Sequence, residues 1–314
     1  MNLPWQQTSW QQLLAGARQN RLPHAWLLAG PAGIGKHHFA QRLAGLLLCE
    51  DKTARDATCG VCPGCHLLAA GHHPDLIRLT PEEDKSQIAV ETLRESMQRL
   101  ALSSHRGGRR ILLIDPADAL NDSGVNSLLK TLEEPPAGAH LILLTERLMA
   151  LKSTLRSRCQ ILRLPVPTVE QGKRWLQEQA PALPAQIAQH FARRPTQALR
   201  QTESPHWDPD RWAELFDGLA AAFGRIESLH KNKQQLLPCL RWLIREATLS
   251  LGAQLRGAND ARPLLQKLGA QATSDWLLEA AQTHRALAGQ TAANPRMLLE
   301  SLMIGLYEKV STKP

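Results

Sequence analysis

Short apolar runs recur along the first half of the chain at spacings that leave room for a helix between them. They cover residues 25–29, 75–79, 111–114, 140–145 and 160–164. Continuous apolar runs of this length are typical of strands that are buried on both faces of a parallel sheet. Helical spacing of apolar residues follows in the stretches 38–48, 90–102 and 126–134. The pattern predicts an α/β domain in which helices cover both faces of a parallel sheet.

Beyond residue 165 the apolar pattern is helical throughout. Pro165-Val-Pro167 is a stiff break, and Thr168-Val-Glu-Gln171 has the spacing of a capping box at the start of a helix. We predict an α/β domain over residues 1–165, a small helical lid domain over 166–204 and an all-α bundle domain over 205–314. In the bundle we expect a helix that starts at Asp208-Pro209, with core positions at Trp212, Leu215, Phe216, Leu219 and Phe223.

A glycine-rich segment directly follows the first apolar run. Gly30-Pro-Ala-Gly33-Ile-Gly35-Lys36 has the pattern G-x-x-x-x-G-K of a nucleotide-binding P-loop, whose backbone N–H groups and lysine bind phosphates. His37 then stands where a P-loop has Ser or Thr, and an imidazole is a poor ligand for Mg²⁺. Asp115 ends an apolar strand as in a Walker B motif, but Pro116 stands in place of a glutamate. We therefore expect a degenerate site that does not bind ATP and Mg²⁺ productively.

Most of the cysteines lie within one short segment, residues 49–65. They are Cys49, Cys59, Cys62 and Cys65. Turn-forming residues between the last three allow the thiolates to converge on one ion, and four thiolates suit a structural, tetrahedral Zn²⁺. His66, His72 and His73 are alternative ligands, but we expect them to be ordinary surface histidines. The spacing predicts a zinc module rather than disulfides.

Charged residues also lie near the last apolar runs. Glu133 and Glu134 are adjacent, so on a helix they point about 100° apart and do not face one site. We expect them to form a solvated helix end. Arg156 and Arg158 precede the run 160–164 and, taken alone, indicate surface charge.

Composition and charge exclude some classes of protein but do not identify a function. The chain has 314 residues and a formal net charge of +8, which is compatible with nucleic acid nearby or with a solvated basic face. No apolar stretch is long enough to span a bilayer, and the first residues lack the pattern of a signal peptide. We expect a cytoplasmic protein that makes no membrane contact.

Four motifs, in this order, carry a family resemblance. They are the loop 30–36, the four-cysteine insert, Leu128-Leu-Lys-Thr-Leu-Glu-Glu-Pro-Pro136 and Ser157-Arg-Cys159. Together they resemble the bacterial DNA polymerase III clamp-loader subunits of the AAA+ class. The resemblance implies an AAA+ domain with a zinc-binding insert, a lid domain and a C-terminal collar domain through which subunits oligomerise.

Departures from the family pattern favour the non-hydrolysing delta-prime type over the ATPase motors gamma and tau. His37, Pro116 and Thr196 stand where the motors keep Ser or Thr, a glutamate and an ATP-sensing arginine. The resemblance implies that Arg158 is an arginine finger in the ATP site of a neighbouring motor subunit, positioned by Ser157 and Cys159. Such a guanidinium typically contributes ~10³–10⁵ in rate.

The implied partners are the gamma/tau ATPase subunits and the delta subunit in a hetero-pentamer. This complex opens the sliding clamp and loads it on primer-template DNA. We expect no independent activity from the chain alone, although the holoenzyme is a DNA-directed DNA polymerase. Two alternatives stay open: an active ATPase motor whose loop tolerates His37, and a zinc-bearing DNA-binding module that uses the basic charge.

Overall fold

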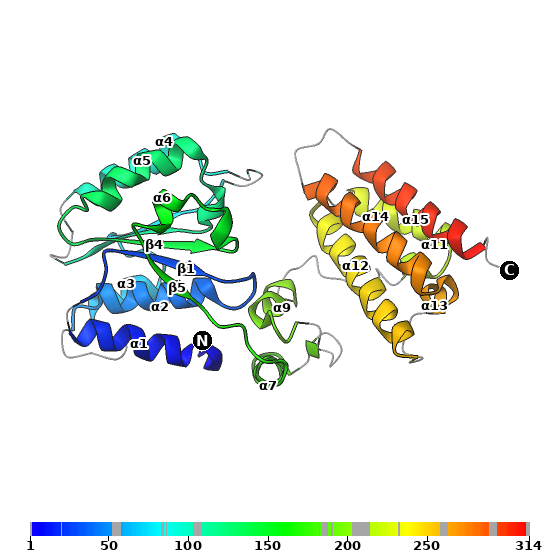
Figure 1. Cartoon of the computed structure of the whole chain (residues 1–314), viewed down its shortest axis with the longest axis horizontal. Helices are drawn as coiled ribbons and strands as arrows, with labels where there is room; N and C mark the ends of the chain where they lie inside the picture. Colours follow the sequence, from blue (N-terminus) through cyan, green and yellow to red (C-terminus); the bar gives the residue numbers. More distant parts are fainter. Residues whose placement is uncertain are drawn as a thin grey trace. The chain divides into compact units, whose positions relative to one another are not determined.

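The chain forms two compact units, Met1–Leu199 and Arg200–Pro314, in a computed structural model (Figure 1). The residues that the structure describes are 2–19, 21–51, 58–82, 85, 87–102, 104, 108–181, 183, 188–189, 191–202, 214–231, 233–257, 263–288 and 294–311. Within these ranges, no helix is long and apolar enough to cross a membrane. The expected boundary between an α/β domain and a lid domain near residue 165 stays a prediction.

A five-stranded parallel sheet is the centre of the first unit. Its strands are β1 (Ala25–Ala29), β2 (Leu76–Leu79), β3 (Arg110–Ile114), β4 (Ala139–Thr145) and β5 (Gln160–Arg163). They lie in the order β2-β3-β4-β1-β5, and every neighbouring pair is parallel. The sheet confirms the strands that the apolar runs predict, to within one residue at each end.

Helices cover both faces of this sheet (Figure 1). On one face, α4 (Val90–Ala101), α5 (Asp122–Glu133) and α6 (Ser153–Arg156) share a core with Leu27 and Leu112 of the strands. On the other face, α1 (Gln7–Arg18) and α2 (Lys36–Leu48) share a core with Trp26 of β1. The remaining elements are the 3₁₀ turns η1 (Pro4–Gln6), η2 (Ala117–Ala119) and η3 (Leu148–Ala150), and the helices α3 (Pro63–Ala69), α7 (Val169–Gln179) and α9 (Pro195–Thr202).

Parallel pairing determines which loops meet at each edge of the sheet. The P-loop follows β1, Asp115 follows β3 and Glu146 follows β4, so all three lie at the carboxyl edge. Arg158 lies in the turn that precedes β5, and α5, which ends at Glu133, leads into β4. These two residues therefore lie at the amino edge, opposite the P-loop.

The second unit is helical. After the turn η4 (Glu214–Phe216) it contains α11 (Leu219–Lys231), α12 (Lys233–Leu255), α13 (Pro263–Leu268), α14 (Ala270–Ala288) and α15 (Pro295–Ser311). Trp242 and Trp276 are buried in its core, and Trp276 Nε1 donates to the carbonyl of Leu302 at 2.9 Å. The all-helical C-terminal region that the sequence predicts is confirmed.

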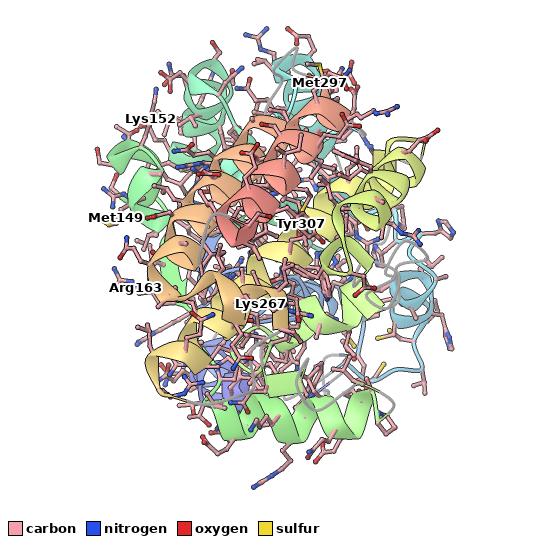
Figure 2. All side chains as sticks on the ribbon, turned by 90° about the vertical axis from the view of Figure 1, so that its right-hand side faces the viewer. Met149, Lys152, Arg163, Lys267, Met297 and Tyr307 are labelled. Atoms are coloured by element: carbon pink, nitrogen blue, oxygen red, sulfur yellow. The ribbon has the colours of Figure 1, made fainter. Side chains whose placement is uncertain are left out.

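The start of this unit differs from the expected single helix. Asp208 and Trp212 lie outside the described residues, and the chain turns between η4 and α11. Tyr307 of α15 (labelled in Figure 2) accepts from the N–H of Gly218 at 2.8 Å and donates to the carbonyl of Leu215 at 3.0 Å. Leu219, expected in the core, is 38% exposed. The turn before α11 is therefore held by Tyr307, a residue that is distant in sequence. Local apolar spacing does not reveal such a contact.

Candidate functional site

The four clustered cysteines converge as their spacing predicts. Cys49 is the C-cap of α2, Cys62 is the N-cap of α3, and all four Sγ atoms lie within 4.8 Å of one another. Cys65 Sγ lies 3.8 Å from both Cys49 Sγ and Cys59 Sγ. Four thiolates at a Zn–S distance of about 2.3 Å around a tetrahedral ion would be ~3.8 Å apart. The cluster has the dimensions of a site that could hold a metal ion.

Backbone N–H groups support the sulfur atoms of this cluster. The N–H groups of Cys62 and Cys65 each donate to the sulfur three residues earlier, at 3.3 Å, and Cys59 N donates to Cys49 Sγ at 3.5 Å. Hydrogen bonds of this kind stabilise thiolates and orient them toward an ion. His73 is buried and accepts from the N–H of Asp75 at 3.1 Å, outside the cluster.

The P-loop keeps the backbone of a phosphate-binding loop. Gly33 and Gly35 have φ values of +76° and +91°, which a side chain rarely tolerates, and α2 begins directly after Gly35. Residues from other elements also hydrogen-bond to the loop. The N–H of Thr196, at the start of α9, donates to the carbonyl of Gly33 at 3.1 Å, and Trp5 Nε1 donates to the carbonyl of Ile34 at 2.9 Å.

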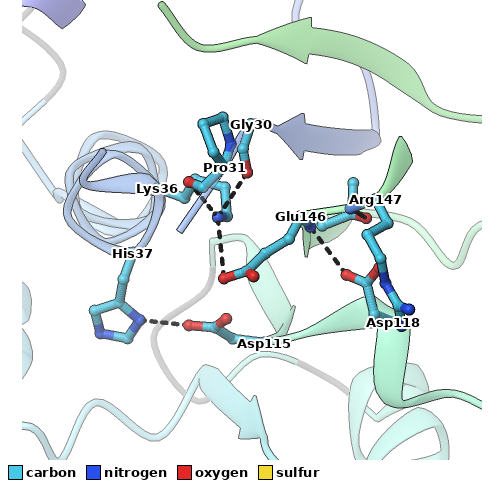
Figure 3. A network of polar contacts seen from close by, with 9 residues as sticks. Gly30, Pro31, Lys36, His37, Asp115, Asp118, Glu146 and Arg147 are labelled. Atoms are coloured by element: carbon cyan, nitrogen blue, oxygen red, sulfur yellow. Dashed lines mark hydrogen bonds and ion pairs between the residues drawn. The ribbon is translucent and has the colours of Figure 1, made fainter. Parts of the chain in front are cut away.

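Lys36 is directed to groups of its own chain (Figure 3). Its Nζ donates to the carbonyls of Gly30 and Pro31, at 2.8 and 3.0 Å, and lies 3.6 Å from Glu146 Oε1. Burial lowers the pKa of Lys36, while the carboxylates of Glu146 and Asp115 oppose this shift. The ammonium that would neutralise phosphate is thus bound by two carbonyls and a carboxylate.

His37 and Asp115, which stand at the positions where a working P-loop ATPase binds Mg²⁺, pair with each other. His37 Nδ1 lies 2.8 Å from Asp115 Oδ2, and both side chains are about one quarter to one third exposed, at 30% and 27% (Figure 3). The carboxylate therefore binds an imidazole in place of an ion. Pro116 follows Asp115 in the chain and supplies no acid–base group.

Sequence reasoning missed Glu146 in this network. Its carboxylate contacts Lys36, and its N–H donates to Asp118 Oδ2 at 3.0 Å (Figure 3). The sequence contains only part of the signal, because it places Glu146 directly after the apolar run that forms β4, but the structure is needed to place β4 next to β1. Residues that follow neighbouring parallel strands meet at one edge.

Arg158 belongs to a separate group of residues at the amino edge. Its Nε donates to Glu133 Oε1 at 2.8 Å, and its Nη2 forms an ion pair with the same oxygen. Its Nη1 donates to the carbonyl of Thr154 at 3.1 Å and lies 3.4 Å from Ser157 Oγ. The side chain is 34% exposed. Glu133, expected to be a solvated helix end, is the partner that sequence reasoning missed.

The two residues next to Arg158 in the chain differ in their surroundings, since Ser157 is exposed and Cys159 is buried. Ser157 Oγ donates to the carbonyl of Thr154 at 3.1 Å. Cys159, which directly precedes β5, is buried in the core, and burial raises the pKa of its thiol to about 12. Cys159 is therefore a neutral, small core residue that anchors the turn.

Comparison with known proteins adds to this geometry. Residues 5–168 match the family model described as DNA polymerase III, delta subunit. A DNA polymerase III subunit delta' from Pseudomonas aeruginosa is 33% identical over 96% of this chain and 96% of that protein. The subunit delta' of Yersinia pestis is 30% identical over 98% of this chain and 96% of that protein.

The chain belongs to the DNA polymerase III delta-prime subunit family. This confirms the resemblance to a clamp-loader subunit that the ordered motifs predict. A DNA polymerase III subunit tau from Salmonella typhimurium is 37% identical over 52% of this chain and 25% of that protein. The similarity to the tau subunit thus covers about half of this chain.

Proposed function

We propose that this delta-prime subunit does not hydrolyse ATP and acts on ATP bound by a neighbouring subunit of the gamma/tau type. Arg158 is the residue that enters the neighbour's site, in a complex that also contains the delta subunit and loads the sliding clamp on primed DNA. The complex works in the bacterial cytoplasm, where its DNA substrate is found. A guanidinium beside the γ-phosphate stabilises the charge that develops in the transition state.

The placement of Arg158 across the sheet from its own P-loop is the observation that carries the proposal. In the pairing of β1 with β5, Trp26 is opposite Gln160 and Ala29 is opposite Arg163. Because β1 and β5 are parallel, the turn that contains Arg158 lies beside the amino end of β1. The P-loop lies at the carboxyl end of β1. A strand advances about 3.3 Å per residue, so the two ends of β1 are ~13 Å apart. Such an arginine serves a nucleotide on another subunit better than one on its own chain.

The contacts at the P-loop support the absence of hydrolysis by this chain. Lys36 is bound by Gly30, Pro31 and Glu146, and His37 by Asp115. Productive binding of Mg²⁺-ATP would require these contacts to break, and hydrolysis would also require a group that activates water, which Pro116 does not supply. We infer that the degenerate loop now serves as a structural link between α2, η1 and the start of α9.

The four-cysteine cluster fits a structural zinc site. Cys49, Cys59, Cys62 and Cys65 supply four ligands, which leaves no coordination position for a substrate. The ion would join the end of α2 to the start of α3, in a segment too small for a core of its own.

Replacement of Arg158 in the reconstituted complex tests the function. Arg158→Ala should reduce the turnover of the site that it serves by ~10³-fold or more, while ATP still binds there. Arg158→Lys should recover only part of the rate, because a point charge lacks the planar fork of donors. Arg156→Ala is the matched control, since Arg156 lies on the same segment and contacts Met149 Sδ at 3.1 Å. An unchanged DNA-stimulated ATPase in the Arg158→Ala complex would exclude the proposal.

A further inference from the structure

Glu133 and Arg158 meet across two elements that are distant in sequence. Glu133 is the last residue of α5, and Arg158 lies between α6 and β5. The helix C-terminus disfavours a carboxylate, because the macrodipole places partial negative charge there. A guanidinium that contacts Oε1 through both Nε and Nη2 compensates for that repulsion. Electrostatic attraction therefore favours a position of the Arg158 guanidinium close to Glu133.

The contacts fix the guanidinium along two of its sides. Glu133 binds the edge formed by Nε and Nη2, while the carbonyl of Thr154 accepts from Nη1. A guanidinium has five N–H donors in one plane, so these partners set the orientation of the plane without using every donor. Glu133 and an incoming phosphate can thus bind different donors of Arg158 at the same time.

We propose that Glu133 is a positioning residue for Arg158 and holds the guanidinium in its working orientation before a neighbour's phosphate arrives. The inference rests on the proposed function of Arg158. A long arginine side chain loses rotational freedom when it is ordered, and ordering it in advance removes that cost from the reaction. Since both side chains are partly exposed, at 34% and 51%, their ion pair contributes little to folding. The effect of Glu133 should therefore appear in turnover rather than in stability.

A competing role for Glu133 makes the opposite prediction. If the carboxylate only occupied Arg158 and had to be displaced by phosphate, its removal would free the guanidinium and raise the turnover. A positioning residue lowers the turnover when it is removed. The direction of the change therefore separates the two roles.

The experiment measures steady-state ATPase of the complex reconstituted with its ATPase subunits. Glu133→Ala should lower kcat about three- to tenfold with the KM for ATP unchanged, because the lost interaction acts in the transition state. Glu133→Gln should be intermediate, since its amide oxygen still accepts from Nε. Glu134→Ala, which removes an exposed neighbouring carboxylate, is the matched control and should match the unmodified complex. The thermal unfolding midpoint of each variant chain should stay unchanged.

A double variant separates this inference from the function on which it rests. In the Arg158→Ala background, Glu133→Ala should cause no further loss, because the group that it positions is absent. Turnover of Glu133→Ala equal to or above that of the unmodified complex overturns the inference, as does an equal loss in both backgrounds. If Arg158→Ala lowers turnover and Glu133→Ala does not, only the positioning role fails. If Arg158→Ala has no effect, the proposed function fails as well.

Discussion

The imidazole of His37 and the carboxylate of Asp115 lie 2.8 Å apart, Nδ1 to Oδ2, at the carboxyl edge of the sheet. In an active P-loop ATPase these positions hold a hydroxyl and a carboxylate that cooperate on Mg²⁺. In this chain the two side chains pair with each other instead. The pair joins the N-terminus of α2 to the end of β3, so an interaction that would serve catalysis serves the fold instead.

Restoring the hydroxyl alone should therefore not restore an ATPase. We predict that His37→Ser gives no Mg²⁺-dependent ATP turnover by the isolated chain, because Lys36 remains bound by Gly30 and Pro31. The same variant should lower the free energy of unfolding by about 0.5–1.5 kcal/mol, the typical net contribution of one hydrogen bond. Phosphate release and urea unfolding measure the two effects.

A second histidine provides the control for this variant. His72 is exposed, so His72→Ser should leave the unfolding free energy within about 0.5 kcal/mol of the original. ATP turnover by the His37→Ser chain would show that the loop tolerates a nucleotide after one substitution, against the structural role inferred for it.

Removal of a cysteine ligand should release the metal and loosen one segment only. Cys62→Ser is expected to abolish the binding of one zinc ion per chain and to lower the thermal midpoint, since metal binding contributes to folding. Cys239→Ala is the control, because Cys239 is buried in the core of the second unit. Elemental analysis of purified protein measures the metal. Full zinc content in Cys62→Ser would contradict the four-cysteine assignment.

Much of the fold follows from local sequence, because its causes are local. A buried parallel strand must be apolar throughout, so β3 and β4 are visible as continuous runs. The helix α7 starts where Thr168 and Gln171 form the capping box that their spacing predicts. The cysteine cluster is predictable for a similar reason, since its four cysteines lie close together in the chain.

The features that could not be predicted from the sequence depend on contacts between segments that are distant in the chain. Glu133 and Arg158 are 25 residues apart, and no periodic pattern connects them. Glu146 reaches Lys36 only because β4 and β1 are neighbours in the sheet. Both acidic residues look like solvated surface charge until the order of the strands is known.

Acid should destabilise the first unit through His140 at the start of β4. Burial lowers the pKa of His140 to about 4, helped by the nearby charge of Arg109, whereas an unfolded histidine has a pKa of about 6.5. The unfolded chain thus binds more protons between these values, and the free energy of unfolding should fall as the pH drops from about 6.5 to about 4. The loss from this group is at most ~3 kcal/mol.

A variant without the titrating group isolates this contribution. His140→Gln should lose less unfolding free energy than the original chain over the same pH interval, as measured by urea unfolding at several pH values. Equal slopes for the two chains would assign the acid sensitivity to other groups.

Close packing at Gly172 provides the last prediction. A Cβ added to Gly172 in α7 would lie 1.6 Å from the carbonyl oxygen of Ala192, a backbone atom that cannot rotate away. We expect Gly172→Ala to lower the free energy of unfolding by about 2–3 kcal/mol, as in other overpacked sites. Gly224→Ala in α11, where a Cβ meets nothing within 4 Å, should instead stabilise its helix by about 0.5–1 kcal/mol. Because Thr196 follows Ala192 closely and binds the carbonyl of Gly33, loosening this contact should also increase amide hydrogen exchange in the P-loop.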